Sequence, residues 1–222
     1  MFRLFQIACL IVFSSIFFST IADSQTQPTP AVTFTVDFPS SQPEHYSIRI
    51  PSDGQAHYES SGRLSADSDD TDSFDLDFTV APQTRQKIFD LSAKAGYFQK
   101  DVDSHHKNLA FTGKKTLAYK DAQRAGESTY NYSSIQAVQE LTSLLQSLSA
   151  TLEFGHRLQY DHRYQKLALD EELKRMEDMA RANQLAEVAA IQPILDRIIA
   201  DPSVINVTRA RARRLLDAAG VH

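Results

Sequence analysis

The sequence predicts an α+β fold, with a mostly antiparallel sheet of about five to six strands, helices on one face and a C-terminal helical extension. Three observations lead to this prediction. Apolar and polar residues alternate with the period of a β-strand in several early segments. The period changes to that of a helix after Pro82 and again after Ile135. Strands and helices do not alternate one by one, which favours an antiparallel sheet over parallel β-α-β units.

We expect four parts along the chain of 222 residues: a signal peptide at 1–22, a flexible leader at 23–30, an α+β domain at 31–155 and a helical C-terminal region at 156–222. This length suffices for one domain of ordinary size with a helical annex.

The N-terminus has the layout of a secretory signal peptide. Arg3 precedes an apolar run at 4–18, and small residues then offer a cleavage site before Asp23 or just after it. The alternative is an N-terminal membrane anchor, but the run is short for a span that needs about 20 apolar residues. We therefore expect an exported protein, periplasmic or secreted. The single cysteine, Cys9, lies in this segment, so the mature chain would be free of cysteine.

The predicted sheet is organised around a hairpin between Tyr46 and Tyr58. Ile48 and Ile50 alternate with polar residues, and the turn that follows contains Gly54, which can take a positive φ. A hairpin is marginal alone, so other strands must pack beside it. The neighbouring strands are predicted from two alternating apolar series, Val32, Phe34, Val36 and Phe38 before the hairpin and Phe74, Leu76 and Phe78 after it.

A helix is predicted from Pro82 to Ala95, because Ile88 and Leu91 recur on one face and proline suits a first helical turn. Gly96 fits the left-handed residue that ends many helices. We expect the chain to fold back onto the core directly afterwards.

Two more strands are predicted between Asn108 and Tyr132, with a turn at 121–126. In this prediction Leu109 and Phe111 belong to the strand region that leads to Gly113.

The C-terminal half predicts long helices. Ser133 or Ser134 can cap the first, which begins at Ile135 and carries an apolar stripe made of Val138, Leu141, Leu144, Leu145, Leu148 and Leu152. Phe154-Gly155 is a possible break, and a second helix is predicted at 157–191. Pro193 is expected to kink or end that helix. A last helix is predicted from Asp201-Pro202 to Ala219, ending at Gly220.

Together these residues resemble a small α+β domain of unknown function that is found in exported bacterial proteins. The resemblance spans roughly 45–150 and rests on Tyr46-x-Ile48-x-Ile50, Asp53-Gly54, Tyr58, Phe89, Leu91, Gly96-Tyr97-Phe98 and the hairpin before the helix at Ile135. Many members carry two cysteines just before the first tyrosine, whereas this chain has none there. The resemblance therefore implies a fold and export, and it implies no redox, metal or catalytic role.

Sequence patterns for a reaction centre are lacking. No Gly-x-Ser-x-Gly segment occurs, and Gly113-Lys114-Lys115-Thr116 lacks the spacing of a phosphate-binding loop. The acidic segment at 65–73 lacks the glycine and glutamate that an EF-hand requires. We therefore expect no catalytic, cofactor-binding or metal-binding residues and no cofactor.

The histidines do not predict a metal site either, because a metal needs three or four converging donors. His105 and His106 are adjacent, and His156 and His162 are six residues apart. His45 and His57 could approach each other across the central hairpin.

One basic cluster is a candidate interaction patch for an acidic partner or a phosphate, and it consists of Arg209, Arg211, Arg213 and Arg214. Two alternatives remain open: these arginines form a solvated face, or they pair with the acidic helix at 170–178.

We interpret the protein as an exported, non-enzymatic binding or interaction module. The partner would be an unknown protein, or a second copy bound through the C-terminal helices. The net charge of −5 gives no general attraction for nucleic acid or for an anionic membrane, so we expect neither as a partner. The alternatives are a cell-envelope hydrolase, or another enzyme, with an unrecognised site and a structural module that self-associates through its helices.

Overall fold

The computed structural model describes residues 29–39, 41–63 and 71–220. The predicted signal peptide at 1–22 and most of the leader and of the acidic segment at 65–73 lie outside the described residues.

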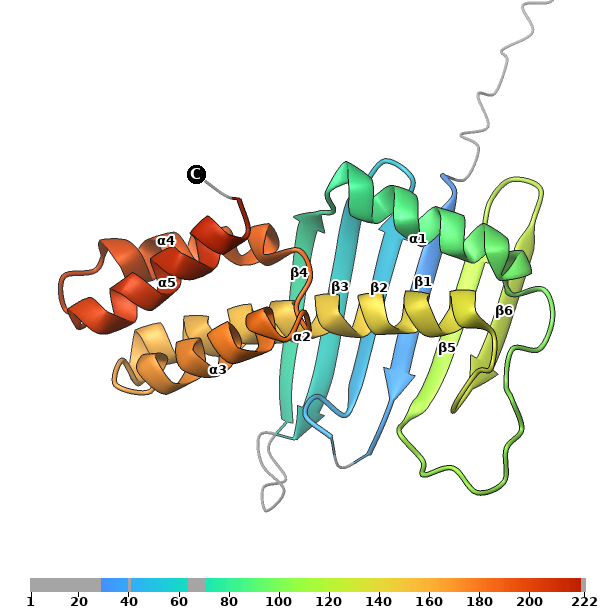
Figure 1. Ribbon diagram of the computed structural model, residues 1–222, viewed down its shortest axis with the longest axis horizontal. Coiled ribbons are helices and arrows are strands. Elements are labelled where there is room, and N and C mark those ends of the chain that lie inside the picture. The colour runs from blue at the N-terminus through green and yellow to red at the C-terminus, as the bar shows by residue number, and fades with distance from the viewer. Residues whose placement is uncertain (1–28, 40, 64–70, 221–222) are drawn as a thin grey trace, which may run out of the picture.

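The predicted α+β architecture is confirmed: a single antiparallel sheet carries helices on one face, and a helical arm projects beyond it (Figure 1). The strands are β1 (Ala31–Asp37), β2 (His45–Pro51), β3 (Gln55–Arg63), β4 (Thr71–Thr79), β5 (Lys114–Lys120) and β6 (Ala125–Tyr130). They pair in the order β4-β3-β2-β1-β5-β6. The helices are α1 (Pro82–Lys94), α2 (Gln136–Tyr164), α3 (Leu169–Arg181), α4 (Gln192–Ala200) and α5 (Asn206–Ala218), with short 3₁₀ turns η1 (Gly96–Phe98) and η2 (Val188–Ile191).

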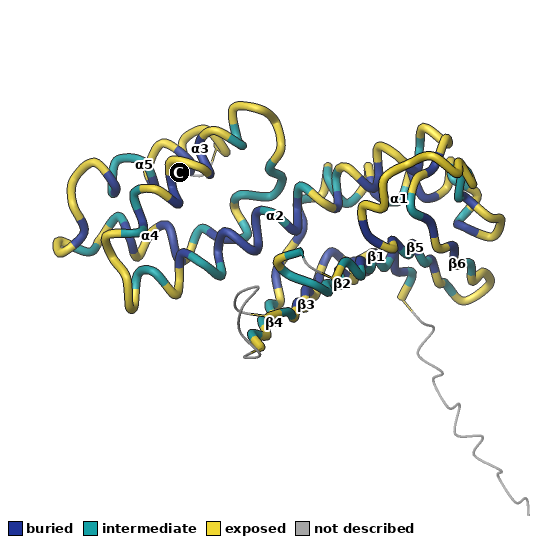
Figure 2. The backbone as a smooth tube through the Cα atoms, turned by 90° about the horizontal axis from the view of Figure 1, so that it is seen from below, coloured by how far each residue is buried: buried dark blue, intermediate teal, exposed yellow. Residues whose placement is uncertain are grey.

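The core lies between the sheet and the pair α1 and α2. Phe34 of β1 stands opposite Ile48 of β2 and Leu117 of β5, and Ile48 stands opposite Tyr58 of β3. All four side chains are fully buried. The other face of the sheet is polar, and in the part of the chain that the structure describes no helix covers it (Figure 2). An antiparallel sheet commonly has one buried and one solvated face in this way.

The connection after α1 forms as the sequence predicts. Gly96 has a φ of +66°, and Phe98 returns to the core with none of its surface exposed. The following segment differs from the prediction. Leu109 and Phe111 are exposed and lie in a loop rather than in a strand, and Phe111 meets Phe38 at the end of β1 with ring centroids 5.7 Å apart.

The predicted helix break at Phe154-Gly155 is wrong, because α2 continues through both residues to Tyr164. Gly155 is buried where Ile191 of η2 packs against the helix. The expected domain boundary between 155 and 156 thus falls inside α2, a helix of 29 residues. The first part of this helix packs on the sheet, and its last part packs in the arm (Figure 1).

The other helix ends also differ from the prediction at 157–191. The chain turns at 165–168, α3 begins at Leu169, and Pro193 lies in the first turn of α4. The last helix begins at Asn206 rather than at Asp201-Pro202. Asp201 does not cap it, because the Asp201 carboxylate accepts hydrogen bonds from Ser203 in its own loop and from Lys166 in the α2–α3 turn.

The arm is a packed helical unit attached to the sheet domain. Leu173 and Met176 of α3, Leu195 and Ile198 of α4 and Ala212 of α5 are fully buried. One polar contact joins the two parts at the start of α1, where the backbone N–H of Ala81 donates to Glu187 Oε2 at 2.9 Å. Among the described residues, we find no helix whose length and apolar character would let it span a membrane.

Candidate binding groove beside strand β4

The four arginines of the predicted interaction patch do not form one free surface. Arg211 donates to Asp170 at 2.9 Å and to Glu177 at 2.6 Å, and Arg214 donates to Glu177 at 2.8 Å. Burial acts to raise the pKa of Glu177, but the hydrogen bonds from Arg214 and Arg211 outweigh it and lower that pKa. Two members of the patch therefore serve the packing of α5 on α3, which is the pairing with the acidic helix that the sequence left open.

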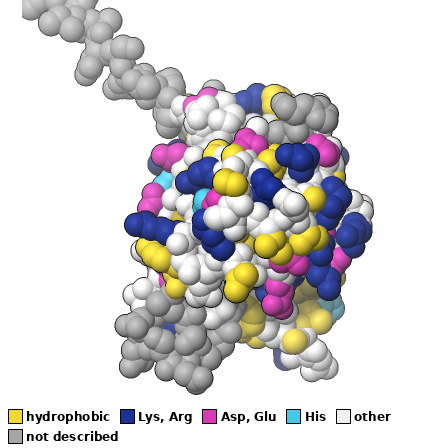
Figure 3. All heavy atoms as spheres, turned by 90° about the vertical axis from the view of Figure 1, so that its left-hand side faces the viewer, with side chains coloured by type: hydrophobic (Ala, Val, Ile, Leu, Met, Phe, Trp, Pro, Cys, Tyr) yellow, Lys and Arg dark blue, Asp and Glu magenta, His cyan; other side chains and the backbone are white. Residues whose placement is uncertain are grey.

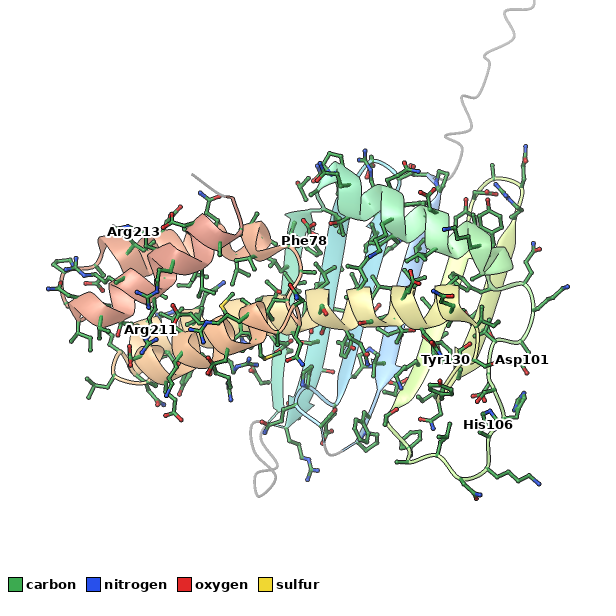
Figure 4. All side chains as sticks on the ribbon, in the orientation of Figure 1. Phe78, Asp101, His106, Tyr130, Arg211 and Arg213 are labelled. Atoms are coloured by element: carbon green, nitrogen blue, oxygen red, sulfur yellow. The ribbon has the colours of Figure 1, made fainter. Side chains whose placement is uncertain are left out.

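The remaining two members are placed differently. Arg209 bonds the side chain of Asn206 in its own helix, and Arg213 is exposed on another side of α5 from Arg211 (Figure 4). Figure 3 looks at the far end of the arm, where Lys and Arg side chains are spread among hydrophobic ones rather than gathered in one place. The patch remains a prediction, now limited to Arg209 and Arg213.

The histidines of the described residues do not gather at one site. Five of them each lie beside an aspartate, in the pairs His45–Asp37, His57–Asp77, His105–Asp101, His156–Asp72 and His162–Asp201. His45 and His57 are not paired across the hairpin, since their partners in the strand register are Ser61 and Arg49. Within the described ranges, no three side chains of His, Cys, Asp or Glu are placed to hold a metal ion.

A groove of about 510 Å³ lies where α2 passes over the edge of the sheet. Its walls include Asp72 and Phe74 of β4 and Glu153, His156 and Tyr160 of α2. The imidazole of His156 stacks on the Phe74 ring, with centroids 4.3 Å apart and planes 5° apart. This contact fixes the helix against the edge strand and gives the groove an aromatic wall.

The base of the groove holds a buried carboxylate. Glu153 is only 9% exposed, and its Oε1 accepts hydrogen bonds from Tyr58 at 2.6 Å and from Ser60 at 2.7 Å. Ser149, one turn earlier in α2, lies 3.1 Å from the Tyr58 hydroxyl. Burial and the neighbouring Glu153 carboxylate raise the pKa of Tyr58, so this hydroxyl remains a donor at neutral pH. The polar groups of Tyr58, Ser60 and Glu153 form a network that holds Oε1 and leaves Oε2 without a hydrogen bond from the described residues.

The cations around the groove are engaged with acids other than Glu153. Arg157 donates to Glu172 of α3 at 2.5 Å, and Arg63 donates to Glu44 at 2.9 Å. Asp161 adds a further carboxyl group to the wall, and burial together with the charge of Glu172 raises its pKa. A buried carboxylate is costly unless it is paired, and in the described chain Glu153 is bonded by hydroxyl groups alone. The groove is therefore suited to a ligand that brings its own positive charge.

A second hollow, of about 800 Å³, lies between the start of α1 and the arm. Glu177 and Arg214 in its wall bond each other, so these two charges are already matched. We therefore consider the groove beside β4 the better candidate.

Sequence reasoning missed this groove, although two signals pointed to it. Glu153 follows Leu152 directly within the apolar stripe of α2, in register with the sheet-facing Ser149. Ser60 occupies an inward position of β3, two residues after Tyr58. A polar residue on each of two faces that are otherwise apolar indicates that the two side chains meet inside the core.

Comparison with models of known protein families and with curated protein sequences finds no match. The resemblance to exported domains of unknown function stays an expectation that rests on the residues quoted for it.

Proposed function

We propose that the protein is an exported binding module that holds a positively charged group of its ligand in the groove beside β4. The observation that carries the proposal is Glu153, which is nine-tenths buried and bonded only by hydroxyls, at the base of an open groove. A ligand ammonium or guanidinium group would supply the missing counter-charge. The aromatic wall made by Phe74, His156 and Tyr160 suits the apolar stem of such a group.

Binding is supported over catalysis by the way the polar groups are held. Tyr58 and Ser60 fix one oxygen of Glu153, and His156 is fixed by stacking on Phe74 with Asp72 at 3.6 Å. The arrangement is rigid and accepts a donor, as a recognition site requires. A hydrogen bond to a charged group contributes about 1.5–3 kcal/mol, so this contact should dominate the affinity for a small cation.

The test is a titration of the purified protein with N-acetyl-arginine amide, followed by two-dimensional NMR. We expect saturable shifts for the amides around Glu153 and His156. The substitution Glu153→Gln keeps an acceptor for Tyr58 and Ser60 but removes the charge, and it should weaken binding by about 10- to 100-fold.

The matched control is Glu127→Gln, which removes an exposed acid on the far strand β6 and should leave binding unchanged. N-acetyl-glutamine amide, a neutral probe of similar size, should not saturate. The proposal fails if Glu153→Gln binds N-acetyl-arginine amide as well as the unaltered protein does, or if the neutral probe binds equally well.

A further inference from the structure

We infer that the ligand is an extended polypeptide segment, which adds to the free edge of β4 as a further strand and places a basic side chain at Glu153. This inference rests on the proposed function and names its ligand class. A second observation supports it, since α2 carries an uncovered face directly beyond the edge of the sheet.

The edge of β4 is open to such a strand. β4 is the last strand of the sheet and pairs with β3 through the register Gln55–Thr79 to Arg63–Thr71. On its other side, no strand among the described residues pairs with it. The outward backbone N–H and C=O groups of an edge strand are a template for an added strand.

The apolar side of β4 is incompletely covered at the same place. Phe74 and Leu76 point to the helix side and are half-buried, whereas Phe78, near the other end of the strand, is buried. A strand added beside Phe74 and Leu76 would bury these two side chains, as most inward-facing residues of the inner strands are buried already.

Helix α2 would cover the inner face of this added strand. Figure 2 shows that α2 passes over β4 and continues into the arm. Glu153, His156, Tyr160 and Tyr164 follow at spacings of three and four, so they share one face of α2. His156 stacks on Phe74 of the edge strand. Tyr160 follows four residues later, about 6 Å along the helix, which is close to the spacing of about 4.8 Å between strands. Tyr160 would thus lie over the first added strand.

The far part of this face is exposed although it is apolar. Tyr160 is 51% exposed and Tyr164 is 62% exposed, and Leu167, in the turn that follows α2, is 90% exposed. The Tyr160 and Tyr164 rings lie 5.1 Å apart and form a continuous ridge from the groove outward. A partner that reaches past the groove would bury this ridge.

Charge decides which polypeptide fits. β4 carries Asp72 on the helix side and Asp75 and Asp77 on the open side, and Glu153 and Asp161 line the groove. Pairing β4 with β4 of a second copy would bring these acids together, and like charges on adjacent strands are destabilising. The surface fits a segment in which apolar residues alternate with lysine or arginine.

The test compares three probes on the full protein: N-acetyl-arginine amide, an eight-residue peptide that alternates valine with lysine and arginine, and the same peptide with N-methyl groups on alternate residues. We expect the unmodified peptide to bind at least about tenfold more tightly than the single residue. N-methylation removes the donors of one strand edge and should abolish this gain. Glu153→Gln should weaken both the peptide and N-acetyl-arginine amide.

The variants Tyr164→Ser and Leu167→Ser should weaken only the peptide, by several-fold, because the single residue does not reach them. The matched control is Ile205→Ser, which alters another exposed apolar residue of the arm, 55% exposed in the loop before α5, and should change neither affinity. All variants are exposed or conservative, and circular dichroism verifies their fold.

The outcomes separate the two proposals. If N-acetyl-arginine amide binds through Glu153 but the peptide gains nothing, or if the N-methylated peptide binds equally well, this inference is overturned and the proposed function stands. If neither probe binds, both fail. Sedimentation of the free protein should show a monomer, and a dimer that the peptide dissociates would make a second copy the occupant and overturn the inference.

Discussion

Replacing Gly155 by alanine tests how the arm is joined to the sheet domain, because two physical effects predict opposite changes in the free energy of unfolding. Alanine in the interior of a helix is favoured over glycine by about 0.8–1.0 kcal/mol. A Cβ at this position would, however, lie 2.5 Å from Cγ2 and 3.2 Å from Cβ of Ile191. Overpacking of this kind costs about 1–3 kcal/mol, and both atoms belong to a buried residue that cannot swing away.

We therefore expect Gly155→Ala to lower the free energy of unfolding, by up to about 2 kcal/mol, despite its better helix propensity. The measurement is urea-induced unfolding followed by circular dichroism. The substitution Ile191→Leu removes the branch that carries Cγ2 while it conserves side-chain volume, and alone it should cost less than about 1.5 kcal/mol.

The double variant gives the decisive comparison. When Gly155→Ala is combined with Ile191→Leu, the alanine should regain most of its advantage in helix propensity, with a coupling energy of about 1–2 kcal/mol between the two sites. If Gly155→Ala alone raises the free energy of unfolding by about 1 kcal/mol, the close approach of α2 and η2 is refuted, and with it the account of how α2 carries the arm.

Three further predictions concern the stability of the fold. Burial raises the pKa values of Tyr46, Tyr58 and Tyr130 above the ordinary value of 10.0. The stability that these tyrosines contribute is therefore complete below pH 10 and declines at higher pH. A spectrophotometric titration at 295 nm should show them ionising together with unfolding, and free ionisation in the folded state would contradict this. Hydrogen bonds from lysine, serine and histidine side chains lower the pKa of Asp201. The stability that Asp201 contributes is therefore present above about pH 4 and is lost as the pH falls. Asp201→Asn should flatten the acid limb of a curve of stability against pH, and an unchanged acid limb would contradict these hydrogen bonds. The Lys115 ammonium donates to oxygens of Thr112, Gly113 and Asn131, where the loop at 99–113 meets the sheet. Lys115→Met should lower the free energy of unfolding by about 1–3 kcal/mol and speed amide hydrogen exchange in that loop. Equal exchange in the two proteins would contradict this prediction.

The strands of the sheet could be predicted because most of them show their buried face directly in the sequence. Tyr46, Ile48 and Ile50 alternate with polar residues, and the structure pairs them with the alternating residues of β1 and β3. Local rules also suffice for Gly96, where a positive φ is needed.

The helix boundaries could not be predicted in this way, because they depend on contacts with distant segments. Gly155 favours a break by propensity, but the packing of Ile191 against it keeps the helix intact and requires a residue without a Cβ. Asp201 looks like a helix cap, but its Oδ2 accepts a hydrogen bond from Lys166, which arrives from the α2–α3 turn, and its Oδ1 accepts from Ser203. In both cases a partner remote in sequence determined the outcome.

Sequence reasoning missed the candidate groove for a related reason. No motif marks it, since Tyr58 and Glu153 are separated by 95 residues and meet only when α2 crosses the sheet. Likewise, the arginines of α5 are conspicuous in sequence, yet Arg211 is held by Asp170 and Glu177 of α3. A cluster of like charges shows where charge is placed and does not show whether it is already paired.

Successive parts of one face of α2 differ in how far the rest of the protein covers them. Val138 and Ser149 are buried against the sheet, His156 is half-buried over its edge, and Tyr164 lies beyond it in solvent, followed by Leu167 in the next turn. A helix that only needed to reach the arm would carry polar residues on this face once the sheet ends. Apolar residues persist here although they are exposed, next to an open strand edge and to the Glu153 carboxylate, which no cation of the described residues bonds. Since exposed apolar surface of this kind marks interaction sites, the end of the sheet at β4 is where we expect a partner to continue it.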